Sequence, residues 1–143
     1  MATIFIISIG ILGAYAVSSR IIAYINLSLS QLTASYLAQE GIELVRNIRD
    51  TNWLERSSWD DGLGNGEWEI AYNENALSSF TGRKINLYDG TQTKFIRKIT
   101  INSAASPQGY PILKISVLVQ WKDKGKDYSV TAQENLYNWH IGT

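Results

Sequence analysis

The amino-terminal part of the chain is almost uncharged, and this constrains the fold more than any other feature. Arg20 is the only charged residue before Glu40. Beyond Arg20, apolar residues recur at three- and four-residue intervals, a spacing that lines one side of an α-helix. No proline occurs before Pro107, so nothing forces a break. The pattern predicts one helix from Ile4 to Asp50, about 70 Å long at 1.5 Å per residue, which ends at the turn-prone residues 50–52.

A helix of this length is too long for a single domain of 143 residues to cover. Part of its apolar surface must therefore be buried by lipid or by other copies of the chain. The positions expected to carry this burial are Ile4, Phe5, Ile6, Ile7, Ile9, Ile11, Leu12, Ile22, Ile25, Leu29, Leu32 and Tyr36.

The opening segment allows three interpretations. Cleavage after Ala16 would make it a secretory signal, and the chain would then be a secreted binding module. As a membrane span it would anchor a monomeric adhesive head, and Gly10 and Gly13 would permit close helix approach. In the third interpretation the segment lies in lipid first and in a filament core later. We favour the third, because it also explains the second uncharged stretch, from Ile21 to Gln39.

From Trp68 onward the apolar period changes to two, which predicts antiparallel strands. Asp89-Gly90 predicts a hairpin turn, and a second turn is expected at Lys122–Gly125. The positions expected to share faces are Trp68, Ile70 and Tyr72; Phe95, Arg97, Ile99 and Ile101; Leu113, Ile115, Val117, Val119 and Trp121; and Tyr128, Val130 and Ala132. Helix residues 35–49 are the available cover for this sheet. The predicted class is α+β, with a helix over residues 1–50, a linker over 51–66 and an antiparallel sheet head over 67–143.

No catalytic or metal site emerges from the sequence. The chain has no cysteine, and its one histidine, His140, has no serine or cysteine motif around it. Glu40 and Glu43 are expected to be helix-surface charges, with Glu43–Arg46 and Arg46–Asp50 as intrahelical pairs. Residues 60–67 contain oxygen ligands and glycines but lack the spacing of a calcium loop. We expect no enzyme activity, no cofactor and no metal.

Charge is distributed unevenly along the chain. Residues 1–81 carry four basic and nine acidic side chains, and residues 82–143 carry nine basic and four acidic ones. This is explained either by chance and a solvated surface, or by copies that meet acidic against basic. The basic set is Lys94, Lys98, Lys114, Lys122, Lys124 and Lys126, near Trp121 and Tyr128. With a net charge of zero, nucleic-acid binding is not expected. Asn26-Leu27-Ser28 fits a glycosylation triplet by chance.

Three stretches carry a resemblance to a known family: "IFIISIGILGAYA", "SYLAQEGIELVRNIRDTNW" and "VLVQWKDKGKDYSVTAQENLYNW". Together they resemble the hydrophobic helix, the helix exit and the closing hairpin of the type IV pilin and pseudopilin superfamily. The resemblance implies a structural, more specifically minor, subunit of a type IV pilus or a type II secretion pseudopilus. Its implied partners are other pilin subunits, an inner-membrane assembly platform and the lipid bilayer. Its implied location is the bacterial inner membrane, and after assembly an extracellular or periplasmic filament.

The family pattern also includes a basic leader, a glycine before the processing site, and an aromatic residue and a glutamate after it. In this sequence Met1 falls where the hydrophobic helix is already under way. The resemblance leaves two explanations open: the start codon is assigned too late, or the chain is a truncated product.

Overall fold

One long helix opens the chain, as predicted. The computed structural model describes residues 2–71 and 74–138, and only the backbone at helix positions 2–14, 16 and 19. Helix α1 spans Ala2–Leu54, so it ends one turn later than the sequence predicts. The chain divides into two compact units, Met1–Thr33 and Ala34–Thr143, which we describe separately and call the amino-terminal segment and the head.

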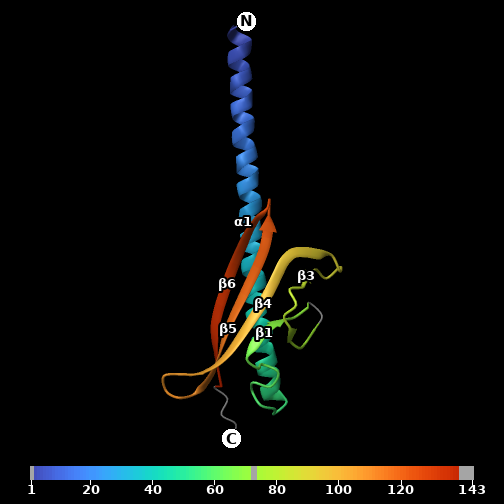
Figure 1. The fold of residues 1–143 in the computed structure, drawn as a ribbon, viewed down its shortest axis with the longest axis vertical. Helices are drawn as coiled ribbons and strands as arrows, with labels where there is room; N and C mark the ends of the chain where they lie inside the picture. Colours follow the sequence, from blue (N-terminus) through green and yellow to red (C-terminus); the bar gives the residue numbers. More distant parts are fainter. Residues whose placement is uncertain (1, 72–73, 139–143) are drawn as a thin grey trace. The chain divides into compact units, whose positions relative to one another are not determined.

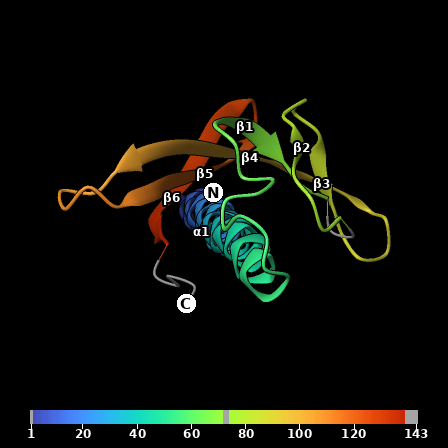
Figure 2. The same cartoon turned by 90° about the horizontal axis from the view of Figure 1, so that it is seen from below.

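The head is an antiparallel sheet with the last part of α1 on one face (Figures 1 and 2). The strands run in the order β2-β1-β4-β5-β6, and β3 pairs with β4 beside β1. Their bounds are β1 Gly66–Glu69, β2 Ser78–Ser79, β3 Lys84–Asn86, β4 Gln92–Ala105, β5 Pro111–Asp123 and β6 Lys126–Tyr137. The predicted α+β class is confirmed.

The three long strands place their apolar residues where the period-two pattern predicts. Alternate residues of β4 and β5 are buried beneath the helix, and the aligned residues of β6 are half-buried. Because successive side chains of a strand point to opposite faces, the register Ile99↔Val117↔Ala132 keeps these side chains on one face. Trp121 closes the core at one end, with Phe95 5.7 Å and Tyr128 5.6 Å away between ring centroids.

The helix contributes small side chains to this core. Ala34, Ala38 and Val45 are fully buried, and Gly41 lies between them on the same side. A Cβ atom on Gly41 would lie 2.8 Å from Val117 Cγ1 and 3.0 Å from Arg97 Cδ. The absence of a side chain at this position therefore allows the helix to lie close against the sheet.

Both predicted turns are present. Asp89 and Gly90 lie in the loop between β3 and β4, where the Gly90 amide donates to the Leu87 carbonyl and Gly90 has a φ of 82°. Lys124 and Gly125 form a two-residue connection between β5 and β6, with φ angles of 48° and 79°. Positive φ at both positions is the geometry of a type I′ turn, which matches the twist of the paired strands.

The segment between helix and sheet, predicted as a linker, is held at both ends. The Asn52 side-chain amide donates to the carbonyls of Trp59 and Asp61, at 3.3 and 2.8 Å. Leu63 is buried, and Asn65 Oδ1 accepts a hydrogen bond from the Ser103 amide. Asn52 lies in the last turn of α1, so its side chain fastens the following segment to the end of the helix.

One sequence-based expectation is wrong in detail. Arg46 does not pair with Asp50: it binds Glu43 at 2.5 Å and Glu134 of β6 at 2.7 Å, while Asp50 pairs with Arg49. In β1, Glu69 is only 5% exposed. Trp68 is half-buried and Ile70 is buried, while Tyr72 lies outside the described residues.

Candidate functional site

A stripe of large apolar side chains on α1 has no cover within the described chain. Ile22, Ile25, Leu29 and Leu32 are 58%, 50%, 56% and 51% exposed. We call these four residues the helix stripe. Tyr36, the last position predicted for this role, is 63% exposed in the head. The described residues therefore do not cover the helix stripe or Tyr36, for which the sequence predicts burial by a partner.

Polar groups beside the helix stripe are satisfied within the helix itself. Ser30 Oγ donates to the Asn26 carbonyl and Thr33 Oγ1 to the Leu29 carbonyl, both at 2.9 Å. Hydroxyls that bond to the carbonyl four residues earlier do not need water. An apolar partner could thus cover this surface without leaving these two hydroxyls unpaired.

The other predicted burial positions, Ile4, Phe5, Ile6, Ile7, Ile9, Ile11 and Leu12, are helical, but their side chains lie outside the described residues. Arg20 is exposed. Within the described part of the chain, no helix combines the length and the apolar character needed to cross a bilayer.

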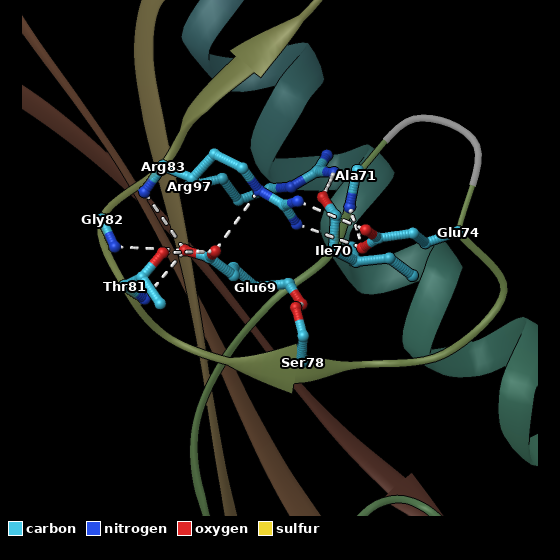
Figure 3. A network of polar contacts seen from close by, with 9 residues as sticks. All are labelled: Glu69, Ile70, Ala71, Glu74, Ser78, Thr81, Gly82, Arg83 and Arg97. Atoms are coloured by element: carbon cyan, nitrogen blue, oxygen red, sulfur yellow. Dashed lines mark hydrogen bonds and ion pairs between the residues drawn. The ribbon is translucent and has the colours of Figure 1, made fainter.

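A second polar feature, around Glu69, fastens the loop that follows β2 (Figure 3). The Glu69 carboxylate accepts hydrogen bonds from the amides of Thr81, Gly82 and Arg83 and from the Thr81 hydroxyl. Arg83 Nε lies 3.3 Å from the same carboxylate, and the Arg83 guanidinium also pairs with Glu74 at 3.1 Å. Burial alone would raise the pKa of Glu69, but these hydrogen bonds and the Arg83 charge outweigh it and lower the pKa.

Arg97 is a buried cation that joins the helix to the sheet. Its side chain is 2% exposed, and Nη1 lies 3.1 Å from Glu40 Oε2. The guanidinium also donates to the carbonyls of Leu37 and Ile70, at 3.2 and 3.3 Å. Burial lowers the pKa of Arg97, and Glu40 offsets part of that effect. This arrangement is structural, because the partners are the helix backbone, the residue after β1 and one carboxylate.

The remaining candidates of the sequence have structural partners or lie elsewhere. Glu40 and Glu43 hold Arg97 and Arg46, and Glu67 at the end of the calcium-like segment binds Lys98 at 2.6 Å. No group of three or more metal-ligating side chains was found among the described residues. His140 lies outside them.

Ion pairs within the head join the acidic first part of the sequence to the basic second part. Acidic residues of the first part bind basic residues of the second part at Glu40–Arg97, Glu67–Lys98, Glu69–Arg83 and Glu74–Arg83. These contacts show that opposite charges far apart in sequence neutralise each other inside one molecule.

Comparisons with protein-family models, with curated proteins and with solved structures gave no match. Function must therefore be argued from the residues and their arrangement.

Proposed function

We propose that the chain is a non-enzymatic structural subunit of a filament, of the kind formed by type IV pilins and pseudopilins, and a minor one. The observation that carries the proposal is the helix stripe, whose four large apolar residues are each half exposed or more. A run of large exposed apolar side chains of this kind marks a surface that binds a protein or membrane partner. The partner we propose is the same part of neighbouring subunits.

Two further features support this assignment. Helix α1 continues without interruption through Ala16, so release by a signal peptidase would cut inside a helix. The head fills its own core with residues of α1 from Ala34 onward, and therefore does not need the helix stripe. In the proposed mechanism the apolar helix that precedes Arg20 holds the subunit in the inner membrane, and the helix stripe then packs against neighbours.

The test is to place charges in the helix stripe of the full chain. Leu29→Glu together with Leu32→Glu should abolish incorporation into filaments or cross-linked oligomers in membranes, because each carboxylate would be buried without a partner. The head should stay folded, since both side chains are about half exposed in the isolated chain. Near-UV circular dichroism of the tryptophans checks the head independently.

Gln31→Glu is the matched control. Gln31 is exposed and lies about 140° around the helix from the centre of the helix stripe at 100° per residue, on the same side as Tyr24. Its side chain is already polar, so a neighbour on that side already meets a polar group, and the change adds one charge at nearly constant size. This variant should assemble better than the double variant. Normal assembly of the Leu29→Glu, Leu32→Glu protein would contradict the proposal.

A further inference from the structure

The head carries an excess of positive charge at the end of the sheet where β5 turns into β6. Lys122, Lys124 and Lys126 surround this turn with Asp123 and Asp127. A hollow of about 470 Å³ beside the turn is lined by Lys122 and Asp127 together with Lys84 and Lys94. We call these seven residues the basic end. Its five lysines and two aspartates give a net charge of +3. Lys84, Lys124 and Lys126 form no ion pair within the described residues.

An acidic segment follows the end of α1. Glu55, Asp60 and Asp61 are exposed there, together with Arg56, and the net charge is −2. Backbone hydrogen bonds from Ser57 to Asn52, from Asp61 to Ser58 and from Leu63 to Asp60 fix its shape. We call residues 55–61 the acidic cap. None of its three carboxylates is in an ion pair within the described chain, although Asp60 accepts a hydrogen bond from Ser58.

The two charged regions lie at opposite ends of the head (Figure 1). The segment that contains the acidic cap is attached through Asn65 to Ser103, which pairs with Leu113. From Leu113 to Asp123, β5 runs a further ten residues, or about 33 Å at 3.3 Å per residue. This distance is about four times the Debye length of about 8 Å at physiological salt. The basic end and the acidic cap therefore do not neutralise each other within one molecule.

We propose that the basic end binds the acidic cap of a second copy of this chain. Because the two surfaces are different and lie at opposite ends of one head, the contact is heterologous and can repeat without closing. This inference rests on the proposed function: helices that pack together raise the local concentration of heads, so a small charged contact suffices. Such contacts set orientation and register more than affinity.

The test uses the absence of cysteine from the chain. One preparation of the full-length protein carries Asp61→Cys and another Lys126→Cys, and both are reconstituted together in liposomes of neutral lipid. A bis-maleimide should cross-link the mixed pair several-fold more than either variant alone. About 1 M NaCl, where the Debye length falls to about 3 Å, should remove most of this difference. A third preparation with Ile25→Cys reports packing of the helix stripe.

Lys114→Cys is the matched control for Lys126→Cys. Lys114 is also an exposed lysine of the sheet, but it pairs with Asn102 and Asn135 at the same end as the acidic cap. Mixed with Asp61→Cys it should give only background cross-linking. Equal yields for both mixtures would overturn the proposal, as would retention of the Lys126→Cys product in high salt.

The outcomes separate this inference from the proposed function. Efficient Ile25→Cys cross-linking without the Asp61–Lys126 product would overturn the contact between heads and leave the filament proposal standing. Loss of both cross-linked products would overturn the contact between heads and the filament proposal together. If anionic lipid in the liposomes protects Lys126→Cys from the maleimide and Asp61→Cys copies do not, the basic end binds lipid headgroups and the proposed contact is wrong.

Discussion

Gly41 offers a direct test of how α1 lies on the sheet. In an isolated helix, replacing glycine by alanine stabilises the helical state by about 1 kcal/mol. In this head the new Cβ would lie 2.8 Å from Val117 Cγ1, well inside the ordinary carbon contact of about 3.5–4.0 Å. Val117 is fully buried in β5, which is paired with a strand on each side, and cannot move aside. Overpacking of this kind costs about 1–3 kcal/mol, so Gly41→Ala should destabilise the head by about 1 kcal/mol net.

The sign of this effect should reverse when the obstructing methyl groups are removed. Val117→Ala alone should cost about 2 kcal/mol through the lost burial and the cavity. In that background the new Cβ still lies 3.0 Å from Arg97 Cδ, which must shift slightly into the space that Val117→Ala leaves. Gly41→Ala should therefore stabilise this background by only about 0.5 kcal/mol, which gives an interaction energy of about 1.5 kcal/mol between the two sites. Urea unfolding of the full chain in a nonionic detergent, followed by near-UV circular dichroism, measures all four proteins. If Gly41→Ala stabilises both backgrounds equally, the close approach of helix and sheet is wrong.

Two further predictions concern the buried charges of the head. Folding lowers the pKa of Glu69, so its carboxylate stabilises the head fully at pH values above the unfolded pKa of 4.5, and this stabilisation is lost as the pH falls through the lower folded pKa. Glu69→Gln should therefore lower the free energy of unfolding at pH 7 and make that free energy less dependent on pH in the acid range. An unchanged stability–pH profile would refute the assignment. Arg97→Ala should cost about 3 kcal/mol in urea unfolding, since it leaves a cavity and two carbonyls without their donor. Glu40→Gln should cost only about 1 kcal/mol, because solvent screens the 46% exposed Glu40 side chain, and equal costs for the two variants would contradict this reasoning.

The faces of the long strands could be predicted because each strand is long enough for its period to fix the register. In β5 the alternation from Leu113 to Trp121 places every second residue in the core, and a slip of one residue would expose them all. The turn at Lys124-Gly125 was likewise visible as a glycine among polar residues between two alternating runs. Local chemistry determined these features, so sequence alone was enough to predict them.

The contacts of Glu69 and Arg97, and the contact of Arg46 with Glu134, could not be predicted in this way, because the partners are distant in sequence. Glu69 lies at an outward position of β1 and is buried only because the loop at residues 81–83 turns its amides toward it. Arg97 was visible as a cation within an apolar face, but the sequence does not say that the Leu37 carbonyl and Glu40 meet it. Arg46 keeps the predicted pair with Glu43, but its second partner is the distant Glu134 of β6 and not Asp50, which the sequence could not show.

The amount of exposed apolar surface on α1 distinguishes a bundle from a simple pair. Complete burial of one large aliphatic side chain is worth about 1.5–3 kcal/mol, so covering the half-exposed helix stripe contributes about 4 kcal/mol per copy. Association costs about 4–15 kcal/mol in lost freedom, so one contact through the helix stripe is marginal by itself. Tyr24, however, is 72% exposed and lies about 120° around the helix from the helix stripe. Apolar groups on more than one side of the helix can contact several neighbours at once. The total free energy gained from apolar burial then exceeds the free energy lost on association, as a filament core requires.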